Sequence, residues 1–84
     1  MPAEVYAAVM ARDRERCQAP YLGFAPEVRC SQGLHVHHAV LRSQGGKDVL
    51  EDLLVLCPRH HVHAHEHART EAELCGVIRH RAPG

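Results

Sequence analysis

The chain has 84 residues, and its ten basic and ten acidic side chains cancel to a formal net charge of zero when histidine is neutral. This length excludes a second domain, and the balanced charge excludes a protein that coats nucleic acid through its overall charge. Because four cysteines and nine histidines accompany a thin apolar core, a bound metal ion is the first candidate for stabilising the fold.

The sequence predicts the element order helix, loop, strand, strand, helix, helix. Apolar residues at helical spacing predict an amphipathic helix from Ala3 to about Arg14, within an N-terminal segment over 1–16. Proline and glycine residues predict an irregular loop from Cys17 to Gln32. Runs rich in Val and Leu predict strands at Leu34–Leu41 and Leu53–Cys57, separated by a Ser-Gln-Gly-Gly turn.

Two helices are expected after the second strand. Pro58 suits the first turn of a helix that continues to about Arg69. A T-x-x-E capping box is then expected to open a final helix, which places apolar residues in the core and ends before Pro83. The box is Thr70 with Glu73, and the apolar residues are Leu74, Cys75, Val77 and Ile78. The expected organisation is a single domain over 1–84, with a core over 17–69 and a C-terminal helix and tail over 70–84.

Three cysteines and one histidine predict a structural zinc site. Cys57 and His60 form a C-x2-H pair at the junction between the second strand and its helix. Cys17 and Cys30 flank the loop, so thiolates at its two ends can close it onto this pair in tetrahedral geometry. The predicted ligands of Zn²⁺ are therefore Cys17, Cys30, Cys57 and His60. Disulfides and buried free cysteines are the alternatives, and Cys75 is expected to be a small apolar residue of the core.

A second group of histidines predicts a catalytic metal site. His61 and His65 lie one helical turn apart on the same face, and His37 and His38 end the first strand. Three imidazole ligands beside one free imidazole are the arrangement of metal-assisted hydrolysis. A regular pleat turns His37 and His38 to opposite faces, so both serve one site only if the strand ends or bulges there. A rival face of the helix holds His60, His63 and His67, and the sequence assigns no role to His35 and His80.

The string LHVHHAVLRSQGG, followed by EDLLVLCPRHHVHAH, resembles the HNH endonucleases. Its HH, SQGG and P-x-x-H-x-x-x-H segments are similar to those of colicin-type DNases, and the resemblance covers Cys17 to about His67. It implies an α+β fold, a small zinc-stapled domain with a ββα-metal core flanked by helices. It also implies that His38 is the general base and that His37, His61 and His65 bind one catalytic divalent ion, which is Mg²⁺, Mn²⁺, Ni²⁺ or Zn²⁺.

One position departs from the family pattern, because the central Asn of the family is Asp52 here. Aspartate keeps an oxygen acceptor but lacks the amide donor. Asp52 then either fixes the loop that bears His38 and polarises that histidine, or weakens catalysis, or supplies an oxygen ligand to a hard cation. We count it among the catalytic residues and leave its role open.

The resemblance implies a metal-dependent endonuclease that nicks or cuts DNA with low intrinsic sequence specificity and assists phage DNA packaging or processing. The partners it implies are DNA and a phage terminase or other packaging protein. It implies no association with a membrane and a protein that is a monomer or a homodimer. The sequence shows no secretory leader and no apolar stretch of about 20 residues, which predicts the cytoplasm of a bacterial or phage-infected cell. Expected phosphate contacts, each with a solvated surface charge as the alternative, are Arg42, Lys47, Arg59 and Arg69.

Two other functions remain open from the sequence. The first is a non-catalytic zinc-containing module that binds nucleic acid with the same fold, with its chemistry silenced by Asp52. The second is a histidine-rich metal-handling protein, which would hold several weak and exchangeable ions. The ordered motifs of the resemblance argue against the second function.

Overall fold

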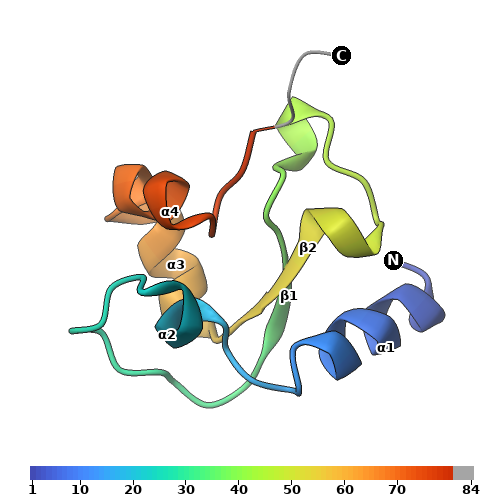
Figure 1. The fold of residues 1–84 in the computed structure, drawn as a ribbon, viewed down its shortest axis with the longest axis horizontal. Coiled ribbons are helices and arrows are strands. Elements are labelled where there is room, and N and C mark those ends of the chain that lie inside the picture. The colour runs from blue at the N-terminus through green and yellow to red at the C-terminus, as the bar shows by residue number, and fades with distance from the viewer. Residues whose placement is uncertain (81–84) are drawn as a thin grey trace.

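The computed structural model describes residues 1–80, and within them the last helix ends at Cys75, before Pro83 as predicted. The fold is α+β, as predicted, with a two-stranded sheet and flanking helices (Figure 1). No helix in this part of the chain combines the length and apolar character needed to cross a membrane. In chain order the helices and strands are α1 (Ala3–Arg12), α2 (Ala19–Leu22), β1 (His35–His38), β2 (Leu53–Leu56), α3 (Pro58–Glu66) and α4 (Arg69–Cys75), with short 3-10 turns at Arg42–Gln44 and Leu50–Asp52.

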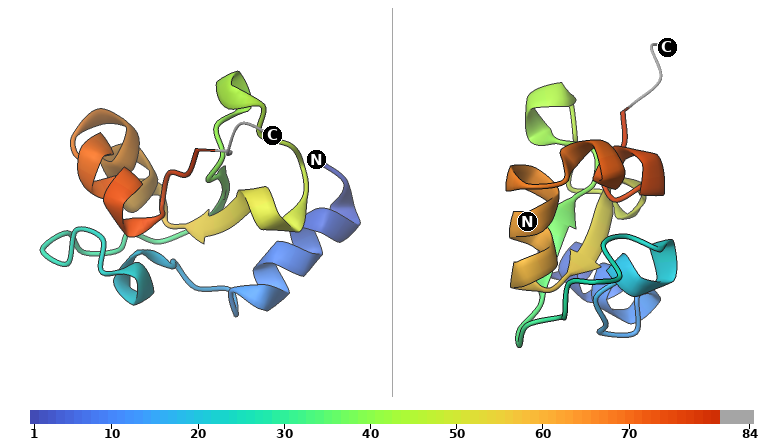
Figure 2. Two further views of the ribbon diagram at one scale, coloured as in Figure 1. Left: turned by 45° about the horizontal axis from the view of Figure 1, so that its top comes forward. Right: turned by 90° about the vertical axis from the view of Figure 1, so that its left-hand side faces the viewer.

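The two strands pair antiparallel, with His37 opposite Leu54 and His38 opposite Leu53. Because side chains alternate along a strand, His37 and Leu54 face one side of the sheet, and His38 and Leu53 face the other. Both views agree that α1 lies on one side and that α3 and α4 lie on the opposite side (Figures 1 and 2). The sheet therefore separates two small cores, one beneath α1 and one beneath the C-terminal helices.

The amphipathic character of α1 is confirmed by its packing. Val9 is fully buried against Leu53 and Val55 of β2, and Val5 and Met10 pack around this contact. Three apolar side chains at helical spacing thus attach α1 to the sheet, although the helix ends at Arg12, two residues earlier than predicted.

The residues that follow α1 bind the outer edge of β2. The buried carboxylate of Asp13 accepts a hydrogen bond from the backbone N–H of Val55 at 2.9 Å, and the Gln18 backbone N–H donates to the Val55 carbonyl at 2.9 Å. Arg12 donates to the Leu53 carbonyl at 2.6 Å and to the Asp13 carboxylate at 2.8 Å. These hydrogen bonds pair the backbone N–H and C=O groups of β2 that do not pair with β1.

The prediction of an irregular loop from Cys17 to Gln32 was wrong in part, because this segment contains the short helix α2. Pro20 lies in its first turn, where a missing N–H costs no helical hydrogen bond, and Gly23 ends it in the left-handed conformation at φ +70°. The same residue types that break a helix interior are therefore compatible with a single turn.

The predicted start of the last helix was also wrong. Helix α4 begins at Arg69 with Ala68 at its N-cap, and no side chain caps it. The Glu73 side chain instead pairs with His80 and Arg69, and Leu74 is 84% exposed rather than part of the core. The predicted core residues Val77 and Ile78 are buried, but they lie beyond the helix, and Cys75 is only half-buried. The preceding helix α3 ends at Glu66 instead of about Arg69.

Candidate metal centres

The structure brings together the three cysteines and the histidine that the sequence grouped. One ligand atom from each of Cys17, Cys30, Cys57 and His60 lies within 4.8 Å of the others. Nδ1 of His60 is 3.7 Å from Sγ of Cys17, 3.6 Å from Sγ of Cys30 and 3.2 Å from Sγ of Cys57. Three sulfur atoms and one nitrogen around a common centre form the donor set of a closed structural zinc site.

Local structure places two of these ligands before any long-range contact forms. Cys57 is the N-cap residue of α3, and its sulfur accepts a hydrogen bond from the backbone N–H of His60 at 3.4 Å. Pro58 occupies the first position of the helix, where its fixed φ suits the turn. Cys17 and Cys30 come from the two ends of the segment that contains α2, which closes over this helix start.

The acidities of the thiols show why this cluster suits a cation. Burial raises the pKa of Cys17, and burial together with the neighbouring Cys17 charge raises the pKa of Cys30 to about 12. Burial also acts to raise the pKa of Cys57, but hydrogen bonds from the backbone of His60 and Ser31 outweigh it and lower the value to about 6. Neighbouring thiolates repel one another, so a divalent cation is the partner that lets all three ionise.

A second cluster gathers three histidines between the sheet and α3. One ring nitrogen from each of His37, His61 and His65 lies within 4.8 Å of the others. His37 comes from β1, whereas His61 and His65 stand one above the other on α3, and their ring centroids are 5.0 Å apart. Within residues 1–80 the cluster offers three ligand nitrogens, so a four-coordinate cation would keep one open position.

The His37 ring has a defined orientation. The side chain is 2% exposed, and its Nε2 lies 2.9 Å from the carbonyl oxygen of Val77. Because a carbonyl can only accept, Nε2 carries the proton and Nδ1 keeps the lone pair for a metal ion. Burial, reinforced by the neighbouring His61 and His65, lowers the pKa of His37 to about 4. The ring is therefore neutral at pH 7, which is the form that binds metals.

His35 also contacts the histidine cluster, and the sequence interpretation assigned it no role. It lies on β1 two residues before His37, so both side chains lie on the same face of the strand. Its Nδ1 is 3.3 Å from Nδ1 of His61. Burial first, and then His65 and His35, lower the pKa of His61. The period of two along the strand was the signal that could have identified His35.

His38 lies on the opposite side of the sheet from His37. The strand ends at His38 without a bulge, and the side chain is half-buried. Its Nε2 is 2.7 Å from Oδ1 of Asp48, and this hydrogen bond lowers the pKa of the Asp48 carboxyl. Since an ionised carboxylate only accepts, Nε2 carries the proton and Nδ1 is free to accept one. The sequence interpretation considered Asp52 for this contact and missed Asp48.

Asp52 fixes the turn between the strands. Its buried carboxylate accepts a hydrogen bond from the backbone N–H of Lys47 at 3.0 Å, and its carbonyl accepts one from Ala39 at 2.8 Å. The turn itself requires glycine, because Gly45 has a φ of +86° and a Cβ on Gly46 would lie 1.8 Å from the Val40 carbonyl oxygen. The Ser-Gln-Gly-Gly cluster thus folds back tightly enough for Asp48 to reach His38.

The four basic residues expected to contact DNA do not form one patch. Arg42 lies at the His38 end, 3.8 Å from the Asp48 carboxylate, and Lys47 is exposed beside it. Arg59 is two residues from His61 and therefore points to the other side of α3, where it donates to a backbone carbonyl. Arg69 pairs with Glu73 at 3.9 Å. The rival histidine face is also absent from residues 1–80, because His60 lies with the cysteines.

A family model described as HNH endonuclease matches residues 15–68. The chain belongs to the HNH endonuclease family. The matched HNH segment contains both clusters as well as Asp48 and Asp52, whereas Arg12 and Val77 lie outside it. No curated protein and no solved structure matches the chain.

Proposed function

We propose that this HNH protein is a metal-dependent endonuclease that hydrolyses DNA phosphodiester bonds with low intrinsic sequence specificity. The observation that supports it best is the convergence of His37, His61 and His65 in one cluster. His38, the proposed base, is the next residue of β1, faces the other side of the sheet and is held there by Asp48. Family membership makes nucleic acid the expected substrate class. Within residues 1–80, the longest helix has ten residues and is packed on the sheet, so strong sequence readout would need a partner.

The three histidines fit a divalent cation. His37 offers Nδ1, because Val77 holds the Nε2 proton, and His61 and His65 face it from one side of α3. When bound, a cation there supplies Lewis-acid stabilisation of the charge that develops on the phosphate oxygens. Imidazole ligands favour Zn²⁺ or Ni²⁺ over Mg²⁺ and Mn²⁺, which prefer oxygen ligands.

The chain's own residues supply the proton transfer. Nδ1 of His38 takes a proton from the attacking water, and the Asp48 carboxylate on Nε2 stabilises the imidazolium that forms. Asp52 keeps the turn in place through the Lys47 backbone, so the acceptor Asp48 stays beside the histidine. Arg42 is placed to hold a phosphate at this end of the site.

The cysteine cluster is proposed to hold a structural zinc ion that keeps α3 and its histidines in position. In the same proposal, residues 17–69 form the catalytic core, with 1–16 and 70–84 as supporting segments. The packaging role, with a phage terminase or other packaging protein as partner, and the cytoplasmic location stay predictions from the resemblance.

Cleavage of supercoiled plasmid tests the proposal. The zinc-loaded protein is assayed with Mg²⁺, Mn²⁺, Ni²⁺ or Zn²⁺ added separately, beside His38→Ala and the control His67→Ala, which changes an exposed histidine at the C-cap of α3 outside both clusters. Because a general base contributes about 100-fold or more, His38→Ala should lose at least that factor while keeping its fold and metal content. His67→Ala should cut at nearly the wild-type rate. Wild-type cleavage by His38→Ala would exclude its role as the base.

Asp52 favours a second candidate, a non-catalytic nucleic-acid-binding module of the same fold. An aspartate in place of the family amide keeps the oxygen that accepts from the Lys47 N–H but lacks the amide's N–H donor. This candidate predicts that the wild-type protein binds DNA without cutting it and that Asp52→Asn restores cleavage. Cleavage by the wild type would reject it.

A further inference from the structure

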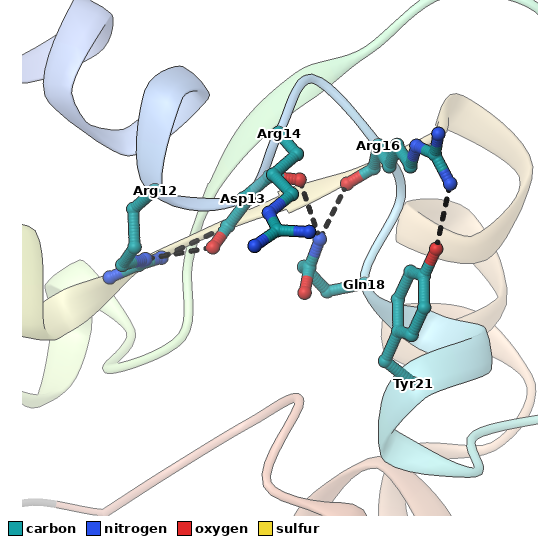
Figure 3. A pocket seen from close by; sticks show the side chains of 6 residues that line it. All are labelled: Arg12, Asp13, Arg14, Arg16, Gln18 and Tyr21. Atoms are coloured by element: carbon teal, nitrogen blue, oxygen red, sulfur yellow. Dashed lines mark hydrogen bonds and ion pairs between the residues drawn. The ribbon is translucent and has the colours of Figure 1, made fainter.

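A pocket of about 370 Å³ lies between the end of α1 and α2 and borders the cysteine cluster, because its residues Arg16 and Gln18 flank Cys17 (Figure 3). It lies along the outer edge of β2, where two of its residues bind Val55. Asp13 accepts from the Val55 N–H, and the Gln18 N–H donates to the Val55 carbonyl. The histidine cluster lies on β1 and α3 and contributes no residue to the pocket lining, so the pocket is separate from it. Its lining residues are Arg12, Asp13, Arg14, Arg16, Gln18 and Tyr21.

Two of the three arginines in this pocket are free of carboxylate partners. Arg12 is committed to Asp13 and to the carbonyl of Leu53. The Arg14 side chain makes no hydrogen bond or ion pair with any of residues 1–80, and Arg16 donates only to the Tyr21 hydroxyl, at 3.2 Å. The pocket therefore presents two guanidinium groups that form no ion pair within residues 1–80, which suits an anionic ligand.

The backbone that presents these arginines adopts an unfavourable conformation. Arg14 and Glu15 have φ values of 57° and 51°, in the left-handed region that residues with a Cβ rarely adopt. The Gln18 side chain holds this turn by donating to the carbonyls of Asp13 and Arg16, each at 2.9 Å. Figure 3 shows the Arg14 guanidinium above Gln18 and the Arg16 guanidinium beside Tyr21. Strained turns of this kind concentrate at functional sites.

The third component is an exposed aromatic ring. Tyr21 is 64% exposed, its hydroxyl accepts a hydrogen bond from Arg16, and its ring contacts no other aromatic ring of residues 1–80. Arginines beside an exposed aromatic ring are how proteins bind single-stranded nucleic acid, with phosphates on the cations and bases stacked on the ring. Duplex DNA keeps its bases stacked on each other and cannot use such a ring.

We propose that this pocket binds an unpaired segment of a nucleic-acid strand, with a backbone phosphate between Arg14 and Arg16 and a base stacked on Tyr21. The inference rests on the proposed function for nucleic acid as the ligand, and it adds an unpaired strand to the substrate that the protein recognises. Such a site would favour DNA with single-stranded, frayed or branched regions.

Binding of fluorescent oligothymidine of about 12 nucleotides tests this inference by anisotropy, in zinc-loaded protein without added catalytic metal. Arg14→Gln should weaken binding several-fold and reduce the slope of log affinity against log salt by about 0.7, the value for one phosphate contact on a single strand. Tyr21→Leu should weaken binding about fivefold or more. The matched controls Arg29→Gln and Tyr6→Leu, which change exposed residues outside the pocket, should stay within about twofold.

Several outcomes would overturn the inference. The first is an equal loss of oligonucleotide affinity in the control variants. The second is unchanged affinity in Arg14→Gln and Tyr21→Leu when circular dichroism shows that both are folded. The third is competition by inorganic phosphate with an affinity equal to that of the oligonucleotide. A duplex of the same length that depends equally on Tyr21 would also overturn it, because paired bases cannot stack there.

Plasmid cleavage in the same variants separates this inference from the endonuclease proposal. If the wild type does not cut, yet oligothymidine binding still requires Arg14 and Tyr21, the endonuclease proposal fails and the pocket assignment stands. If the wild type cuts and both variants bind like the wild type, the pocket assignment fails and the endonuclease proposal stands.

Discussion

Replacing Cys57 with serine tests the structural zinc site with little other disturbance. The side chain is 1% exposed, and its sulfur lies 3.2 Å from Nδ1 of His60. Serine is nearly the same size and is itself a favoured N-cap, so the start of α3 keeps its capping group. What the substitution removes is a thiolate ligand, and any large loss of stability therefore reports on the metal.

The expected magnitude follows from the size of the protein. At about 0.05–0.15 kcal/mol per residue, a chain of 84 residues has an unfolding free energy of roughly 4–13 kcal/mol. A structural zinc ion contributes about 10–16 kcal/mol in small domains, as large as that total. The core beneath α3 also includes the ligands Cys17 and Cys57, so losing the ion disturbs the core itself. Losing the ion should therefore leave the chain largely unfolded at 25 °C.

Far-UV circular dichroism, thermal unfolding and zinc content by mass spectrometry give the measurements. Cys57→Ser should bind less than one zinc per chain and lose its cooperative transition, and a strong chelator should do the same to the wild type. The control Cys75→Ser changes a half-buried thiol outside the cluster, which donates only a long 3.7 Å hydrogen bond to the Gly23 carbonyl. It should keep its zinc and lose no more than about 1 kcal/mol. A folded, zinc-replete Cys57→Ser protein would refute the assignment, and so would an equal effect of Cys75→Ser.

Three further predictions concern buried polar groups. Asp52→Asn keeps an oxygen acceptor for the Lys47 N–H and should unfold at the wild-type urea midpoint, whereas Asp52→Ala should lose about 1 kcal/mol; equal midpoints for the two variants would contradict this. Asp13→Ala leaves the buried Val55 N–H unpaired and should cost about 2 kcal/mol in urea unfolding, and a loss within error would show that the contact is dispensable. Because the pKa of His37 falls from 6.5 to about 4 on folding, the unfolded chain binds the proton first, and stability should decline by about 3 kcal/mol as pH falls through this window. Urea midpoints at pH 7 and pH 5 should differ more in the wild type than in His37→Leu, and parallel declines would assign the acid sensitivity to other groups.

The sequence by itself determined the features that depend on local spacing. The interval between His61 and His65 is one helical turn, so any helix through this segment places both on one face. The C-x2-H pair of Cys57 and His60 sits at a helix start, where the capping geometry alone brings sulfur and imidazole together. The apolar stripe that includes Val9 likewise identified the buried face of α1. Periodicity is a property of neighbouring residues, and so it can be read before the chain folds.

Only the tertiary structure decided which distant groups complete the sites. The carboxylate that contacts His38 is Asp48, because the glycine turn folds back and brings it there, whereas the sequence interpretation considered Asp52. The group that orients His37 is a backbone carbonyl, that of Val77, which carries no side-chain signature at all. It reaches β1 because the Arg79 N–H bonds the Ala39 carbonyl at 2.7 Å and draws the C-terminal segment across the strand. Such contacts depend on how the chain closes over long separations, where many pairings are compatible with the same local pattern and packing selects one.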